Sequence, residues 1–160
     1  MRVAIITVSS SRAGGAGGDE SGERLELFAH GLGGEIAARE IVADDRGLIE
    51  QRLRHFSDED VCALVLTTGG TGVAPSDVTP EATRAVIERE VPGIAEAMRA
   101  ASRSHTKHWM LSRGLAGIRG GTLIVNFPGN PRAIAQSGEA VADALPHALA
   151  LIACHPSEHR

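Results

Sequence analysis

The sequence predicts an α/β fold, a three-layer sandwich with helices on both faces of a mostly parallel sheet. The main observation is that apolar, β-branched runs alternate with segments of helical periodicity along the 160 residues. These runs are apolar at nearly every position, as in Val3–Val8, which is typical of strands covered on both faces. A glycine turn at Gly120-Gly121 joins two β-prone runs and predicts one antiparallel strand.

Composition indicates one globular domain, which we assign to residues 1–155, followed by a disordered tail at 156–160. Hydrophobic content is 42% and charged content 22%, both ordinary values, and a net charge of −4 does not favour nucleic acid as a partner. No apolar stretch approaches the ~20 residues that span a bilayer, and the apolar N-terminus is too short for a secretory signal. We therefore expect a cytoplasmic protein without a membrane partner, with Cys62 and Cys154 as buried free thiols.

The first half of the chain predicts two strand–loop–helix units. After the first strand, the Gly- and Ser-rich segment 9–22 fits either a connector or a ligand loop, and its composition slightly favours the connector. Its glycine spacing misses the dinucleotide-binding fingerprint. A helix is expected over 23–32, a strand over 36–42 and a helix over 46–56.

Paired carboxylates, Asp44 and Asp45, follow the second predicted strand. Either of them could cap the next helix, which is a common use of Asp and the simpler interpretation. Both uses can hold together, with Asp45 as the cap and Asp44 facing a ligand.

The central stretch combines an apolar strand, Val61–Leu66, with a glycine cluster and a new helix. We expect Thr79 to be the N-cap of that helix and Pro80 its first residue, with the helix running to about Glu90. A loop that leaves backbone N–H groups unpaired near a helix start is a common phosphate site. Asp77 stands just outside the helix, where it could hold a divalent cation that bridges phosphates.

The second half predicts a helix at 94–101, a hairpin of strands 115–118 and 122–127, and a last helix. Between them, His105, Lys107 and His108 with Trp109 form either a ligand segment or a solvated connection anchored by the indole. The last helix is expected over 132–154, with Asn130 as its cap and a kink at Pro146.

The residues expected at the carboxyl edge of the sheet include phosphate donors and two separated acids, without a convincing nucleophile–base pair. Phosphoryl or nucleotidyl transfer fits this set, because positioning and a metal ion suffice when the substrate supplies the nucleophile. A P-loop is excluded, since no Gly-Lys-Ser or Gly-Lys-Thr follows the glycines.

Five segments stand out as an ordered set that extends through most of the chain: Thr67–Gly72, Asp77–Thr83, Pro92-Gly93, Ser112-Arg113 and Pro128–Pro131. Together they resemble the molybdenum-cofactor biosynthesis family, which includes the molybdopterin adenylyltransferases and the N-terminal domain of gephyrin. The resemblance implies Mg²⁺-dependent adenylylation of molybdopterin by ATP, with release of pyrophosphate. It also implies a homotrimer and possible hand-over of the product to a molybdate-inserting enzyme.

Site residues follow from the same resemblance. Asp44 and Asp77 match the two catalytic acids of the family, and we assign them to Mg²⁺. The residues expected to bind the substrates are Ser11, Asp19, Ser21, Gly22, Thr68, Gly69, Gly70, Thr71, Gly72, Ser112, Arg113, Pro128, Gly129 and Asn130. Within this set the glycines would cradle phosphate, and Ser112, Arg113 and the 128–131 segment would line the pterin side.

Two positions depart from the family pattern. Many relatives have Asp where this chain has Ser10, and Arg where it has Ser76. The family also contains paralogues that bind molybdopterin with little or no adenylylation. A non-catalytic molybdopterin-binding protein or scaffold is therefore the alternative function, although the presence of both Asp44 and Asp77 favours an enzyme.

Overall fold

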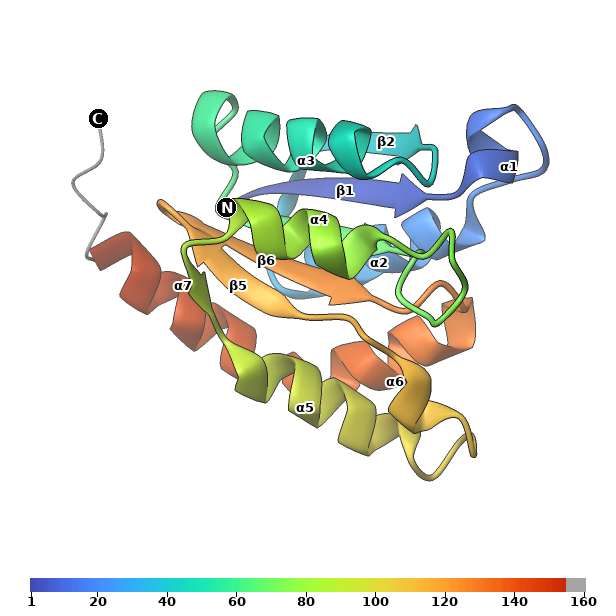
Figure 1. The fold of residues 1–160 in the computed structure, drawn as a ribbon. Coiled ribbons are helices and arrows are strands. Elements are labelled where there is room, and N and C mark those ends of the chain that lie inside the picture. The colour runs from blue at the N-terminus through green and yellow to red at the C-terminus, as the bar shows by residue number, and fades with distance from the viewer. Residues whose placement is uncertain (155–160) are drawn as a thin grey trace.

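The computed structural model describes residues 1–154 and contains one six-stranded sheet with helices on both faces (Figure 1). The strands are β1 (Arg2–Val8), β2 (Glu35–Val42), β3 (Leu64–Thr68), β4 (Arg89–Glu90), β5 (Ala116–Arg119) and β6 (Thr122–Phe127). Their spatial order is β2-β1-β3-β6-β5-β4. Strands β2, β1, β3 and β6 are mutually parallel, whereas β5 is antiparallel to both of its neighbours. The predicted three-layer α/β fold is confirmed.

The helices form the two outer layers of the sandwich. They are α1 (Ser10–Ala13), α2 (Glu20–Gly31), α3 (Arg46–Arg54), α4 (Thr79–Val86), α5 (Pro92–Ser102), α6 (Pro131–Val141) and α7 (Ala144–Cys154), with a π-helical turn η1 (His55–Glu59) and a 3₁₀ turn η2 (Trp109–Leu111). Helices α3 and α4 cover one face of the sheet, and α2, α5, α6 and α7 cover the other (Figure 1).

Alternation along the central strands divides the apolar side chains between two cores. In β1, Val3 and Ile5 belong to the core beneath α2, α5, α6 and α7, while Ala4 and Ile6 belong to the core beneath α3 and α4. All four are fully buried. A strand that faces helices on both sides has no solvated face, which explains the continuous apolar runs in the sequence.

The helix expected from Thr79 to about Glu90 ends earlier, at Val86, and that prediction is wrong. The chain leaves the helix to pair with the edge of the sheet. The N–H of Glu88 donates to the carbonyl of Ile118, and the N–H of Val91 to that of Ala116. Sheet pairing therefore overrides the local helical preference of these residues.

Other boundaries also differ from the predictions. Strand β3 begins at Leu64 rather than Val61, because Val61 is exposed and has a φ of 47°, outside the β region. Helix α2 begins at Glu20, three residues before the expected start. The expected last helix is two helices, and the chain breaks before Pro146, which lies in the first turn of α7, where its missing N–H costs little.

Cys62 is a buried free thiol as predicted, and burial raises its pKa. Cys154 is free but exposed at the end of α7, so the expectation that it is buried is wrong. Residues 155–160, which include the predicted disordered tail, lie outside the described residues. Within residues 1–154, no helix has the length and apolar character needed to cross a bilayer.

A buried amide joins β6 to β3, α4 and the segment before β5. The Asn126 amide nitrogen donates to the hydroxyls of Thr67 (3.0 Å) and Thr83 (2.9 Å), and its carbonyl oxygen accepts from the N–H of Leu115 (3.2 Å). Asn126, Thr67, Thr83 and Leu115 are all buried, so their polar groups have to be satisfied by hydrogen bonds to one another.

We expect Asn126→Ala to lower the free energy of unfolding by about 2–3 kcal/mol, because it leaves buried polar groups unpaired. Chemical denaturation measures the change. The matched control is Asn130→Ala, the same substitution at an exposed helix cap, with an expected loss of about 1 kcal/mol. If both variants lost the same free energy of unfolding, the buried Asn126 network would stabilise the fold no more than an ordinary helix cap does.

Candidate active site

The loops that follow β1, β2, β3 and β6 meet at the carboxyl edge of the parallel strands (Figure 1). The order β2-β1-β3-β6 places the β1 and β3 loops at the middle of this edge. Ligands of open α/β sheets bind at such an edge, outside the ends of the strands. Four segments far apart in the sequence therefore contribute to one site.

The glycine loop, residues 69–78, follows β3 and requires glycine at its start. Gly69 and Gly70 have φ values of 94° and 66°, in the left-handed region. A Cβ at Gly69 would lie 2.3 Å from the carbonyl oxygen of Val8, so the loop rests directly on the end of β1. Sequence pattern alone identified these glycines, and the structure explains why side chains are excluded there.

Thr79 holds the start of this loop and is not the N-cap of α4, contrary to the prediction. The N-cap is Val78, whose side chain cannot accept a hydrogen bond. The buried Thr79 hydroxyl instead donates to the carbonyl of Gly69 (2.9 Å), and its N–H donates to that of Gly70 (3.1 Å). The two bonds turn the loop carbonyls towards α4.

The backbone N–H groups of Gly70, Thr71 and Gly72 are unpaired. No oxygen within residues 1–154 accepts a hydrogen bond from any of the three. Successive free N–H groups in a left-handed turn create a concave, partially positive surface that suits an anion such as phosphate.

Asp44 lies on one side of the glycine loop and is held by Ser10. The Ser10 N–H and hydroxyl both donate to Oδ2 of Asp44, each at 3.0 Å. The Asp44 N–H donates to the Ser10 hydroxyl in return (2.9 Å). Asp45 caps α3 by accepting from the N–H of Leu48, which confirms the predicted cap, and the ligand-facing role of Asp44 stays a prediction.

Asp77 lies near the other end of the loop. Its Oδ2 accepts from the N–H of Ala74 (3.0 Å) and would lie 2.8 Å from a Cβ placed on Gly72. Oδ1 of Asp44 would lie 3.4 Å from a Cβ placed on Gly70. Both carboxylates therefore border the glycines that carry the unpaired N–H groups.

The two acids supply the kind of donor that magnesium prefers. Oδ1 of Asp44 and Oδ1 of Asp77 accept no hydrogen bond from any described residue, so each acid keeps one oxygen available. Mg²⁺ is usually held in this way, by one or two carboxylates together with phosphate oxygens and water. Among residues 1–154 there is no cluster of three or more His, Cys, Asp or Glu that could form an all-protein metal site.

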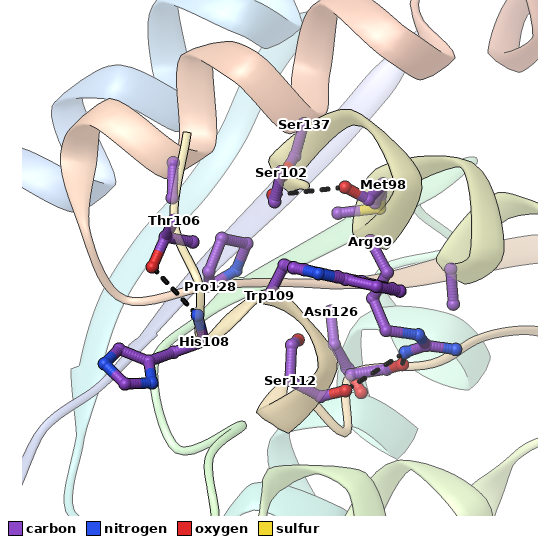
Figure 2. Close-up of a pocket in the computed structure, with 13 residues that line it drawn as sticks. Met98, Arg99, Ser102, Thr106, His108, Trp109, Ser112, Asn126, Pro128 and Ser137 are labelled. Atoms are coloured by element: carbon purple, nitrogen blue, oxygen red, sulfur yellow. Dashed lines mark hydrogen bonds between the residues drawn. The ribbon is translucent and has the colours of Figure 1, made fainter. Parts of the chain in front are cut away.

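A cavity of about 140 Å³ lies beside the loop, between α5, η2, the end of β6 and α6. Figure 2 shows its side chains converging around Trp109. Its lining consists of Ala95, Met98, Arg99, Ser102, Thr106, His108, Trp109, Ser112, Gly114, Asn126, Pro128, Ala133 and Ser137. An apolar cavity of ~150 Å³ accepts a benzene-sized ring, so this one suits a ring system better than a whole nucleotide.

Of the predicted pterin-side residues, Ser112 and Pro128 line this cavity. His108 and Trp109 do so as well, which favours the ligand interpretation of their segment, whereas His105 and Lys107 do not line it. The sequence did not identify the face of α5 that carries Met98 and Arg99. Helical spacing places these residues on one face with Ala95 and Ser102, but cannot tell a cavity from a core.

Several predicted binding residues hold the loops together. The Thr68 hydroxyl donates to the carbonyl of Pro128 (2.8 Å), and the Ser21 hydroxyl donates to that of Gly129 (2.7 Å). Asn130 caps α6. Ser11 lies exposed in α1, where its hydroxyl is 3.3 Å from that of Ser9.

Asp19 and Gly22 belong to the start of α2. Asp19 is buried and caps the helix, accepting from the N–H of Gly22 (3.0 Å) and the hydroxyl of Thr7 (2.9 Å). A Cβ on Gly22 would collide with the Asp19 carboxylate, at 2.1 Å. Arg113 points away from the cavity, and its guanidinium bonds to the glycine loop and to Glu81.

A second, larger groove of about 370 Å³ lies at the amino end of β6. It is lined by Arg89, Val91, Ile118, Leu123, Ala148, Leu151 and Ile152. Arg89 is the single polar side chain in this lining, so the groove lacks the converging polar groups that orient a ligand.

Comparison with known proteins places this chain in a family. The family model described as a probable molybdopterin binding domain matches residues 4–147. A molybdopterin adenylyltransferase of Helicobacter pylori is 41% identical over 154 residues, which covers 95% of this chain and 88% of that protein. The molybdopterin adenylyltransferase of Escherichia coli K12 is 40% identical over 147 residues, covering 90% of this chain and 75% of that protein.

Solved structures agree as well. The molybdopterin biosynthesis enzyme MoaB from Thermus thermophilus has 46% sequence identity to this chain and superposes with a TM-score of 0.90. The superposition covers 97% of this chain and 98% of that one. The fold, the ordered motifs and these matches lead to one assignment: the chain belongs to the molybdopterin-binding domain family of molybdenum cofactor biosynthesis.

Proposed function

We propose that this chain is a molybdopterin adenylyltransferase, which transfers the adenylyl group of ATP to molybdopterin. The observation that carries the proposal is the run of unpaired N–H groups at Gly70, Thr71 and Gly72, bordered by two carboxylates. The cavity around Trp109 lies beside this run, since its lining residue Gly114 neighbours Thr71. An anion site next to a ring-sized cavity matches a substrate that joins a phosphate to a pterin.

In the proposed reaction, an oxygen of the terminal phosphate of molybdopterin forms a bond to the α-phosphorus of ATP. The bond from that phosphorus to the bridging oxygen breaks, and pyrophosphate leaves with the electron pair. The glycine loop would hold phosphate oxygens through its N–H groups, which are already oriented before the substrate binds. Such preorganised donors stabilise charge on the transferring group.

Asp44 and Asp77 would hold Mg²⁺, which would neutralise charge on the phosphates when bound. Ser10 would keep the Asp44 carboxylate oriented, since it bonds only to Oδ2. The apolar cavity would receive the pterin ring, with Trp109 and Pro128 as flat apolar walls. Holding both substrates at one edge of the sheet would supply much of the rate enhancement through proximity.

The proposal includes three further expectations from the sequence resemblance: a cytoplasmic location, a homotrimeric assembly and hand-over of the adenylylated product to a molybdate-inserting enzyme. Light scattering coupled to size-exclusion chromatography measures the assembly, for which we expect three times the mass of the 160-residue chain.

The first test is pyrophosphate release from Mg·ATP with molybdopterin added, beside a control without the pterin. We expect release that depends on both molybdopterin and Mg²⁺. Tight molybdopterin binding without release would overturn the transferase and support the alternative, a non-catalytic molybdopterin-binding protein or scaffold.

We expect Asp44→Asn and Asp77→Asn each to lower turnover by roughly 100-fold or more, because a neutral amide is a poor Mg²⁺ ligand. Molybdopterin binding and the melting temperature should change little, since the remaining side-chain oxygen can still accept from Ser10 or from the N–H of Ala74. Stopped-time pyrophosphate assays across Mg²⁺ concentrations measure the effect. Full activity in either variant would show that the substituted acid does not hold the Mg²⁺ ion.

We expect Gly70→Ala to weaken ATP binding by about tenfold or more, because alanine resists the left-handed φ of 66°. Its Cβ would also lie 2.4 Å from the Thr79 hydroxyl that holds the loop. Calorimetric titration with Mg·ATP measures the change. Gly93→Ala is the matched control, since a Cβ there meets no atom within 4 Å.

The left-handed φ alone costs alanine about 1–2 kcal/mol and the contact with the Thr79 hydroxyl adds to this, so we expect Gly70→Ala to be less stable than wild type but still folded. Unchanged ATP affinity in a folded Gly70→Ala protein would exclude the glycine loop as the phosphate site. Loss of folded protein in this variant alone would make Gly70 a structural residue.

A further inference from the structure

We propose that Arg113 is a positioning residue that holds the glycine loop and Asp77 in their ligand-binding arrangement. The sequence resemblance placed Arg113 on the pterin side, but its side chain faces the opposite way. The inference rests on the proposed function for its catalytic consequence, and on the hydrogen bonds around Arg113 for its geometry.

Four hydrogen bonds run from Arg113 to residues of the glycine loop and α4. Its backbone N–H donates to the carbonyl of Thr71 (2.7 Å). In the guanidinium, Nε donates to the carbonyl of Gly72 (2.6 Å), Nη2 donates to the carbonyl of Asp77 (2.8 Å), and Nη1 donates to the Glu81 carboxylate. One residue thus connects both ends of the loop to the start of α4.

The loop has few other ties to the rest of the domain. Thr79 holds Gly69 and Gly70, and the Ala74–Asp77 turn is closed by bonds within itself. Among residues 1–154, Arg113 is the one residue outside the segment 69–81 that hydrogen-bonds to residues 71–77. Outside its own segment, Asp77 is hydrogen-bonded through its carbonyl to Arg113.

The charge balance around Arg113 indicates that it contributes by positioning the loop and not by attracting an anion directly. Glu81 pairs with the guanidinium, and the hydrogen bond from Arg113 lowers the pKa of Glu81, so this carboxylate stays ionised and balances the cation. The remaining guanidinium bonds go to neutral carbonyls. The positive charge of Arg113 is thus already compensated, and its contribution to anion binding is to keep the N–H groups of Gly70–Gly72 oriented.

Only arginine offers this arrangement. Its planar guanidinium presents donors in fixed directions, so Nε, Nη1 and Nη2 reach three separate acceptors at once. A lysine at this position would keep the charge and much of the aliphatic chain, but its single ammonium cannot reproduce the fork. Arg113→Lys therefore removes the hydrogen-bonding geometry of the side chain while it keeps the positive charge.

The experiment compares wild type, Arg113→Ala and Arg113→Lys by amide hydrogen exchange, Mg·ATP titration and pyrophosphate release. In peptides covering 70–78, the hydrogen-bonded N–H groups are those of Ala74 and Asp77, and we expect them to exchange faster in both variants, with the sheet unchanged. ATP affinity should fall about tenfold and turnover about 100-fold, because small displacements of positioned groups are costly. Molybdopterin affinity should fall less than ATP affinity, because Arg113 does not line the cavity that would hold the pterin ring.

Arg119→Ala is the matched control. Arg119 also donates to a carboxylate, Asp58, and to a carbonyl, that of Val86, but at the other end of the sheet. Its loss should lower stability without changing exchange in 70–78 or ATP affinity. This control separates a general loss of stability from a local release of the loop.

The outcomes distinguish the inference from the proposed function. Wild-type exchange and ATP affinity in folded Arg113→Lys would overturn the inference, and so would a loss of molybdopterin binding that leaves the loop unchanged. A wild-type protein that releases no pyrophosphate would refute the transferase. Even then, exchange and ATP affinity would decide whether Arg113 holds the loop.

Discussion

The close approach of three backbone segments at the middle of the sheet edge is the constraint on which the site depends. Gly69 lies against the carbonyl of Val8, at the end of β1, and a Cβ on Gly129 would lie 3.4 Å from the Gly69 Cα. Glycine at 69 and 129 lets the loops after β1, β3 and β6 touch without side chains between them. The unpaired N–H groups of Gly70–Gly72 are displayed beside this junction.

Around this junction, several of the predicted binding residues join loops to one another. Ser21 ties the start of α2 to Gly129, Thr68 ties β3 to Pro128, and Arg113 ties the segment before β5 to the glycine loop. Such residues matter for binding whether or not they touch a ligand, because binding depends on the spacing of loops from four strands. Structure is needed to separate these residues from those that face the site.

The departure at Ser10 also has a physical account. Its hydroxyl donates to the Asp44 carboxylate and accepts from the Asp44 N–H, so a small neutral side chain orients the acid without adding a negative charge. An aspartate in its place would set two carboxylates close together and favour a bound cation to offset them. Ser76 is exposed, and no contact in the structure explains its difference from the family pattern.

The sequence by itself determined the α/β layers, the central strands, the glycine loop and the use of Asp45 as the cap of α3. These features follow from local patterns: continuous apolar runs, glycine at left-handed positions and Asp before a helix. Tertiary structure alone decided that Arg113 faces Gly72 and Glu81, that Thr79 bonds to Gly69, and that α5 supplies a wall of the cavity. Tertiary structure also decided that α4 ends at Val86, because the residues that follow, Arg89 and Glu90, pair with β5. Each of these depends on partners distant in the chain, which local periodicity does not encode.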